Sequence, residues 1–199
     1  MPLERVICHW TAGSYNPNDQ DKEHYHFIID GNGKVIEGDH KPEANISTSD
    51  ADGYAAHTRA CNTGSIGVSI AAMAGAKESP FDAGPYPIRA MQWSAMVSKV
   101  AALCKQYGIA VTPRTVLTHA EVQGTLGIQQ AGKWDITRLP FEPALIGAKA
   151  VGDKLRADVS IHLSGLNPPA APPDYINRAD LAAIFRRIAD ELTAPSGSR

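Results

Sequence analysis

The chain has 199 residues, of which 43% are hydrophobic and 20% are charged. These values are typical of one globular domain, and a chain of this length buries about 70% of its unfolded surface on folding. The formal net charge is −2, which provides no positive field for nucleic acid or an anionic membrane. We therefore expect no nucleic-acid partner.

Two further features bear on the compartment. The N-terminal residues carry no apolar stretch of the kind a signal peptide needs, and no apolar run approaches the ~20 residues that span a bilayer. The three cysteines, an odd number, indicate reduced thiols rather than a disulfide framework. We expect synthesis in the cytoplasm without a signal peptide, no stable membrane insertion, and a monomer.

The first part of the chain has the pattern of β-strands. Short apolar segments rich in β-branched residues predict strands at 5–8, 25–29, 34–37 and 65–70. The glycines of Asp30-Gly31-Asn32-Gly33 favour a hairpin between the second and third strands. The intervening segments are polar and rich in turn residues, so we expect loops at 9–13, 14–24, 40–56 and 73–89.

Helical periodicity begins after these strands. Residues 90–107 carry one apolar stripe, and Gly108 provides a stop signal. A short strand is expected at 115–118, a loop at 122–134 and a helix at about 139–155. The stripe consists of Trp93, Met96, Val97, Val100, Leu103, Cys104 and Tyr107.

The mixture of strands and helices predicts an α/β fold, with a single mixed central β-sheet flanked by α-helices. We assign residues 1–157 to this domain. Residues 158–199 are expected to form a Pro-rich linker, centred on 167–173, and a C-terminal helix that Asn177 caps.

Two histidines occupy equivalent positions in this pattern. His9 follows the first strand and His119 follows the strand at 115–118, while Asp135 comes in a loop 16 residues later. Strand ends at one edge of a sheet are where ligands converge. Two imidazoles and a carboxylate match a catalytic zinc site, which leaves a fourth position for water. A histidine at a strand end is also commonly structural, so the spacing alone leaves both readings open.

Five sequence blocks, taken together and in this order, resemble the type-2 N-acetylmuramoyl-L-alanine amidases. This family includes phage lysozyme-type amidases, anhydro-muropeptide amidases and peptidoglycan recognition proteins. The resemblance extends over roughly residues 4–145. The blocks are Ile7-Cys8-His9-Trp10-Thr11-Ala12, Tyr25-His26-Phe27-Ile28-Ile29, Asn62-Thr63-Gly64-Ser65-Ile66-Gly67-Val68, His119-Ala120-Glu121-Val122 and Lys133-Trp134-Asp135.

The resemblance implies hydrolysis of the amide bond between N-acetylmuramic acid and L-alanine in peptidoglycan or a muropeptide. It implies a Zn²⁺ cofactor at one edge of the sheet, with His9, His119 and Asp135 as ligands. It also implies catalytic roles for Tyr25 and Lys133. A preorganised lysine can stabilise an oxyanion, and a tyrosine hydroxyl can orient the attacking water. The alternatives are a strand-edge aromatic residue and a solvated loop lysine.

Three other residues are candidates for substrate binding. His57 matches a family position close to the substrate, although it could equally be a plain loop residue. Trp10 could line the cleft or pack in the core. Glu121 could orient a ligand histidine or lie at the surface as a solvated carboxylate.

One departure from the family concerns the third ligand. The loop at 123–132 is longer than in compact family members, so the match onto Asp135 is less direct than the matches onto the histidines. Asp153 and Asp158 are the alternative third ligands.

The resemblance leaves the biological setting open. A phage or prophage endolysin that reaches the periplasmic cell wall after release is favoured, because Tyr25 matches the lysozyme-type branch. The alternatives are a cytoplasmic muropeptide-recycling amidase, an effector delivered by a secretion machine, and a non-catalytic peptidoglycan recognition module. The complete set of ligands and catalytic candidates favours an enzyme over the recognition module.

Overall fold

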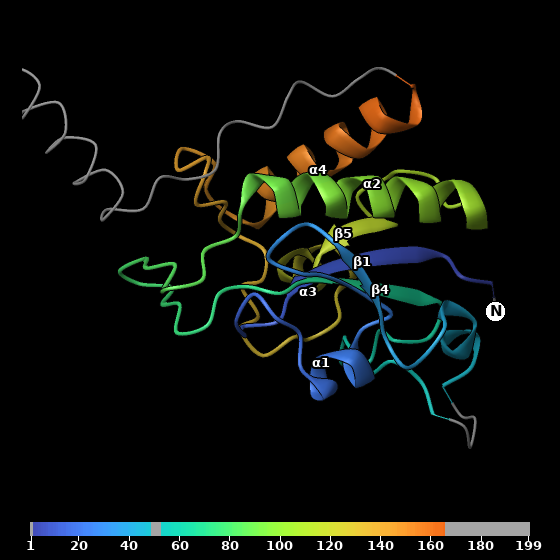
Figure 1. The fold of residues 1–199 in the computed structure, drawn as a ribbon. Helices are drawn as coiled ribbons and strands as arrows, with labels where there is room; N and C mark the ends of the chain where they lie inside the picture. The colour runs from blue at the N-terminus through green and yellow to red at the C-terminus, as the bar shows by residue number, and fades with distance from the viewer. Residues whose placement is uncertain (1, 49–52, 166–199) are drawn as a thin grey trace, which may run out of the picture.

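A computed structural model describes residues 2–48 and 53–165, and its centre is a five-stranded sheet in the order β3-β2-β4-β1-β5 (Figure 1). β4 pairs in parallel with β1 and β2, β1 pairs in parallel with β5, and β3 closes the sheet as an antiparallel edge. The predicted mixed sheet is therefore confirmed. The strands are β1 (Arg5–Trp10), β2 (Phe27–Ile29), β3 (Val35–Glu37), β4 (Ser65–Ile70) and β5 (Val116–Thr118).

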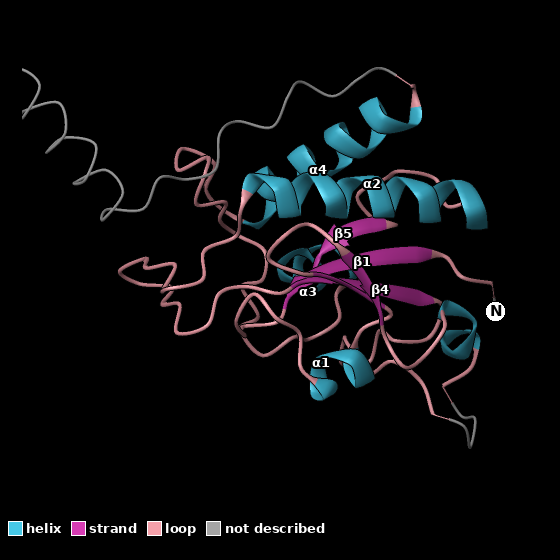
Figure 2. Cartoon of the chain, in the orientation of Figure 1, coloured by secondary structure: helices cyan, strands magenta, loops and turns pink. Residues whose placement is uncertain are grey.

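Helices cover the sheet on both faces (Figure 2). The long helices α2 (Ala90–Tyr107) and α4 (Ala148–Leu163) lie together on one face, and the short helix α1 (Asp19–His24) lies on the other. Because the inner strands are covered on both sides, all residues of β4 and all but the first of β1 are buried. The main core fills the space between the sheet and the two long helices.

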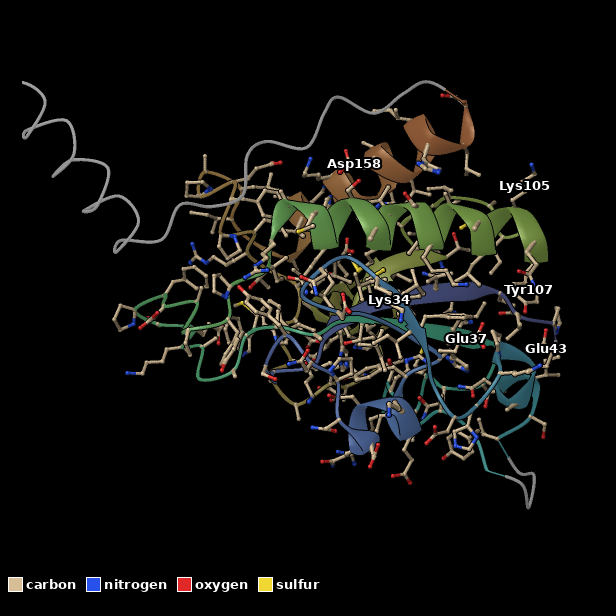
Figure 3. All side chains as sticks on the ribbon, in the orientation of Figure 1. Lys34, Glu37, Glu43, Lys105, Tyr107 and Asp158 are labelled. Carbon is tan, nitrogen blue, oxygen red and sulfur yellow. The ribbon has the colours of Figure 1, made fainter. Side chains whose placement is uncertain are left out.

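The two ends of the sheet differ in what surrounds them. The chain begins at the end where the Tyr107 hydroxyl donates a 2.7 Å hydrogen bond to Glu43, which joins α2 to the 3-10 helix η1 (Pro42–Ile46) (Figure 3). The opposite end, where β1 and β5 finish, is surrounded by the long loops at 71–89 and 127–147 (Figure 1). These loops frame the edge where the sequence predicts a metal site.

The predicted helix at 90–107 is confirmed residue for residue. Its apolar stripe packs on the sheet, and Gly108 ends it with a positive φ of 66°. The prediction for 139–155 is wrong at both ends, because α4 begins at Ala148 and ends at Leu163. Pro140 and Pro143 lie in the irregular segment before it, where proline disfavours helix. α4 thus continues without a break through the expected boundary at 157/158, while the expected linker and last helix lie outside the described residues.

Two short α-helices, besides the 3-10 helix η1, stand where loops were expected. α1 is capped by Asn18, which pairs reciprocally with Asp21, and α3 (His119–Leu126) is capped in the same way by Thr118 with Glu121. Both pairs have the spacing of a capping box, a signal that is visible in the sequence. The predicted strands are otherwise found, although β1 continues through His9 and Trp10 instead of ending at Cys8, and β2 begins at Phe27 instead of Tyr25, which caps the end of α1.

The three cysteines, Cys8, Cys61 and Cys104, are buried and free, which agrees with the expected reduced thiols. Among the described residues, no helix combines the length and the apolar character needed to cross a membrane.

Candidate metal centre

The two histidines meet because two neighbouring parallel strands end together. Cys8 of β1 lies opposite Thr118 of β5 in the sheet register, and each is followed by a histidine. His9 is the next residue of β1 and is fully buried, while His119 is the first residue of α3 and is 4% exposed. The register of the sheet therefore brings the two imidazoles to one edge, as the sequence predicts.

Asp135 completes the cluster from the loop after α3. Its backbone carbonyl accepts a 2.6 Å hydrogen bond from the Ala120 amide, which ties the loop to the start of the helix. The side chain of Asp135 is buried, and its Oδ2 lies 3.1 Å from the Nδ1 atoms of both His9 and His119. The two Nδ1 atoms are also 3.1 Å apart. The three potential ligand atoms thus form a triangle with equal sides.

This triangle fits a tetrahedral metal ion. Zinc bonds of 2.0–2.1 Å to nitrogen and oxygen place adjacent ligand atoms about 3.3 Å apart in a tetrahedron. The observed separations of 3.1 Å are close to this value. Within the part of the chain that the structure describes, these three residues form a group whose ligand atoms could hold a metal ion. A triangle of three ligands leaves a fourth tetrahedral position for water or substrate.

The alternative third ligands lie elsewhere. Asp153 is half-exposed on α4 and pairs with Lys149 and Arg156. Asp158 accepts a 2.8 Å hydrogen bond from the Trp93 indole. Both carboxylates are therefore paired with residues of α2 or α4 and do not face the cluster.

The nitrogen atoms on the far side of each imidazole are also in contact with other groups. His9 Nε2 lies 3.2 Å from Nδ1 of His57, whose Nε2 lies 3.3 Å from the carbonyl oxygen of Ser65. His119 Nε2 lies 2.9 Å from Oε1 of Gln130. Gln130 was not predicted from the sequence, since nothing distinguishes it within the polar loop 122–134.

The electrostatics of the cluster suit metal binding near neutral pH. Burial lowers the pKa of His9 from 6.5 to about 4, so its imidazole is neutral. Burial alone would raise the pKa of Asp135, but the contacts and charges of His119 and His9 outweigh it and lower the pKa to about 2. Burial also holds the pKa of His57 well below its usual value. A dication bound to two neutral imidazoles and one carboxylate would keep a net charge of about +1.

The two catalytic candidates lie beside the cluster. The ring of Tyr25 is centred 5.2 Å from the ring of His9. Burial, followed by the negative charge of Asp135, raises the pKa of Tyr25 above its usual value of 10, so its hydroxyl keeps its proton. Lys133 is exposed, and its positive charge is close enough to help lower the pKa of His9.

The three residues predicted to bind substrate are all buried. Trp10 packs edge-to-face against Trp134 at 4.6 Å within the main core. His57 lies behind His9, as described above. Glu121 is 6% exposed and accepts hydrogen bonds from Arg156 at 3.0 and 3.2 Å, so it is neither a surface carboxylate nor a partner of His119.

The protein is thus an α/β protein with a mixed sheet, and a buried His-His-Asp cluster at the edge of the sheet could hold a metal ion and leave one ligand position open. The family model described as "N-acetylmuramoyl-L-alanine amidase" matches residues 1–136, more than half of the chain. The chain belongs to this family. The matched region contains all three residues of the cluster.

Several solved structures are similar to the chain. The Staphylococcus aureus hydrolase AmiA, in complex with its ligand, is 16% identical, with 84% of this chain and 78% of that chain covered and a TM-score of 0.49. The Ph2119 endolysin from a Thermus scotoductus bacteriophage is 19% identical, with 67% and 81% covered and a TM-score of 0.42. Drosophila PGRP-LB is 16% identical, with 66% and 86% covered and a TM-score of 0.37. No curated protein sequence matches the chain.

Proposed function

We propose that the chain is a zinc-dependent amidase that cleaves the bond between N-acetylmuramic acid and L-alanine in peptidoglycan. Membership of the amidase family supports the reaction. The observation that carries the zinc assignment is the equal-sided 3.1 Å triangle of His9, His119 and Asp135. Two imidazole nitrogens and a carboxylate oxygen that face one another in a buried site are a ligand set that suits zinc.

His9, His119 and Asp135 would hold the ion. When bound there, zinc would supply Lewis acidity toward the amide carbonyl and a water whose pKa is lowered to about 7. The neutral imidazoles leave much of the positive charge of the ion uncompensated, which preserves that acidity.

Tyr25 and Lys133 would act on the substrate from the side of the cluster. Lys133 is an exposed cation beside the cluster, suited to hydrogen-bond the oxyanion that develops on the amide carbonyl. Tyr25 keeps its hydroxyl proton near neutral pH. It can therefore donate a hydrogen bond to the reacting groups, but it does not act as a phenolate base.

Digestion of purified sacculi, followed by mass spectrometry of the products, tests the reaction. We expect stem peptides that begin with a free L-alanine amino group, released from intact glycan, and loss of the activity in chelator. Products consisting only of cut glycan or cut cross-links would overturn the assignment. Binding to sacculi without any cleavage would identify a recognition module instead.

We further propose that the protein acts as a phage or prophage endolysin. The position of Tyr25 in the block that resembles lysozyme-type amidases supports this setting. Expression in a Gram-negative cytoplasm should be harmless until a holin or a permeabilising agent gives access to the wall, and lysis should then follow. A recycling amidase would instead show a higher kcat/KM on soluble muropeptides than on intact sacculi.

A further inference from the structure

Each ligand histidine has two ring nitrogens, and only an unprotonated one can bind a metal ion. Which nitrogen is unprotonated depends on the partner of the other one. Both candidate ligands present Nδ1 to the cluster, so each must carry its proton on Nε2. The groups that contact Nε2 therefore determine whether the site is ready for metal.

On the His9 side, a backbone carbonyl determines which atoms donate and which accept. The Ser65 carbonyl oxygen can only accept, so His57 donates to it through Nε2. With its proton on Nε2, neutral His57 keeps a lone pair on Nδ1, which lies 3.2 Å from His9 Nε2 and 2.8 Å from the Thr58 hydroxyl. The Thr58 oxygen is itself 3.4 Å from His9 Nε2, so His9 Nε2 faces an acceptor on either residue. His9 thus donates through Nε2 and keeps its Nδ1 lone pair for the cluster.

On the His119 side, backbone carbonyls again determine which atoms donate and which accept. The amide nitrogen of Gln130 lies 3.0 Å from the carbonyl oxygen of Arg59 and 3.4 Å from that of Ile128. Both oxygens can only accept, which fixes the orientation of the Gln130 amide. Its Oε1 therefore faces His119 and accepts from Nε2 at 2.9 Å. This contact leaves the Nδ1 lone pair of His119 free for the cluster.

The two chains of hydrogen bonds meet in one stretch of three residues, 57–59. His57 and Thr58 contact the first histidine, and the Arg59 carbonyl orients the second through Gln130. This stretch is itself held, because the Thr58 amide donates a 2.7 Å hydrogen bond to the side chain of Asn62. Asn62 lies just before β4, so the stretch is anchored to the central sheet.

We propose that residues 57–59, together with Gln130, form a positioning segment that sets the metal-binding tautomer of both ligand histidines. His57 is then a positioning residue and not a substrate contact, which agrees with its burial behind His9. The inference rests on the proposed zinc site. It adds that the two imidazoles are oriented from a single loop, by partners that touch neither metal nor substrate.

The test uses the zinc-loaded full chain and two variants, Gln130→Met and His57→Phe. Each removes the acceptor for one histidine and keeps a side chain of similar size. Removal of such partners weakens metal affinity by about 10–100-fold. We expect this loss in both variants, measured by competition with a chelator. The matched controls Gln129→Met and His162→Phe, at exposed positions, should keep the wild-type affinity.

NMR detection of imidazole protons separates positioning from a general structural effect. The wild type should show two Nε2 protons that exchange slowly with water, one from each ligand histidine. Gln130→Met should lose only the signal of His119, and His57→Phe only that of His9. If His57→Phe does not fold, Gln130→Met alone tests the inference, because its signal and affinity can both be measured.

The outcomes distinguish this inference from the proposed function. Variants that keep wild-type affinity and both protected protons, in a chain that binds zinc, would overturn the inference and leave the amidase assignment intact. A lower melting temperature without a change in affinity would reduce residues 57–59 to a structural role, and would also overturn it. A wild-type chain that binds no zinc would show that the zinc site itself is wrong.

Discussion

Two buried polar clusters each include a residue from the first turn of α3, but only one of them has all its hydrogen-bonding groups paired within the chain. His119 faces the metal cluster, and Glu121 faces Arg156 of α4. Residues two apart on a helix point in directions about 200° apart, so one turn serves both clusters. One cluster is a buried ion pair that is complete within the chain, and the other is a set of three ligand atoms that could hold a metal ion.

The Glu121 cluster is closed. Its carboxylate accepts hydrogen bonds from the Arg156 guanidinium at 3.0 and 3.2 Å and from the Thr118 amide at 2.9 Å. Arg156 also donates to the carbonyl of Val116 in β5. Each buried acceptor therefore has a donor within the chain, and the positive and negative charges balance without a ligand.

The metal cluster is open. In the tautomer in which both ring protons lie on Nε2, its three atoms at mutual distances of 3.1 Å are all acceptors. Burying a carboxylate without a matching charge is costly. A cation bound between the three atoms would supply that charge, and the following predictions test this difference between the two clusters.

The largest effect is expected from Asp135→Ala. Without the carboxylate, two neutral imidazoles remain, and zinc content should fall from about one per chain to nearly none. Hydrolysis of sacculi should become undetectable, while the control Asp19→Ala, at a fully exposed position, should match the wild type. Metal analysis of the purified variants makes the measurement. Full zinc content in Asp135→Ala would mean that the third ligand is another residue.

Arg156→Met should break the closed cluster instead. Glu121 would stay buried without its partner, which costs about 3–5 kcal/mol of unfolding free energy. Zinc content per folded chain should stay near one. Urea unfolding gives the stability, and the double variant Glu121→Leu/Arg156→Met should recover much of the loss because no charge is left unpaired. If Arg156→Met lost zinc and kept its stability, the Glu121–Arg156 pair would support metal binding rather than the fold, contrary to this prediction.

The sequence predicted the open cluster better than the closed one. His9 and His119 could be found because each follows an apolar strand, and parallel strands end at one edge. Asp135 lies in an irregular loop, where no periodicity locates a side chain, so only the family resemblance pointed to it. Glu121 and Arg156 come from different helices, and their pairing depends on how α4 packs, which no local pattern encodes.

Among the helices, too, local sequence patterns predicted some elements and missed others. Strong periodicity and Gly108 located α2 to the residue, whereas α1 and α3 are only six and eight residues long and have little apolar periodicity to detect. Their capping boxes were the available signal. Gln130 was not singled out and His57 was expected to lie near the substrate, because the contacts of both residues depend on backbone carbonyls brought together by tertiary folding.

Lys133→Ala should impair the reaction without emptying the open cluster. Loss of one oxyanion donor lowers kcat by about 10²–10³-fold, and zinc content should remain near one. Tyr25→Phe should behave similarly, and the exposed Lys34→Ala provides a control with an unchanged rate. Steady-state kinetics together with metal analysis make the comparison. Loss of zinc in either site variant would assign that residue to metal binding.

Acid should destabilise the metal-free protein through buried imidazoles. Burial lowers the pKa of His9, and that of His26 behind the cluster, from 6.5 to about 4. Between these pH values the unfolded chain binds protons that the folded chain excludes, so stability falls as the pH is lowered through this window. Each group contributes on the order of 3 kcal/mol at the lower end. Urea unfolding from pH 7 to 4 should show this slope, and His26→Phe should reduce it; an equal slope in the variant would contradict the assignment.

The smallest effects should come from two glycines, one against each cluster. A Cβ on Gly67 of β4 would lie 2.5 Å from the ring of His57, and a Cβ on Gly152 of α4 would collide with the carboxylate of Glu121. Overpacking of this kind costs about 1–3 kcal/mol of stability, so Gly67→Ala and Gly152→Ala should unfold at similarly reduced urea concentrations. Their zinc affinities should differ, because only Gly67→Ala displaces a partner of a ligand histidine. We expect affinity about tenfold weaker in Gly67→Ala and unchanged in Gly152→Ala. Equal losses of affinity in both variants would contradict this prediction. They would mean that a change in the Glu121 cluster also alters the zinc ligands, through the first turn of α3 that both clusters share.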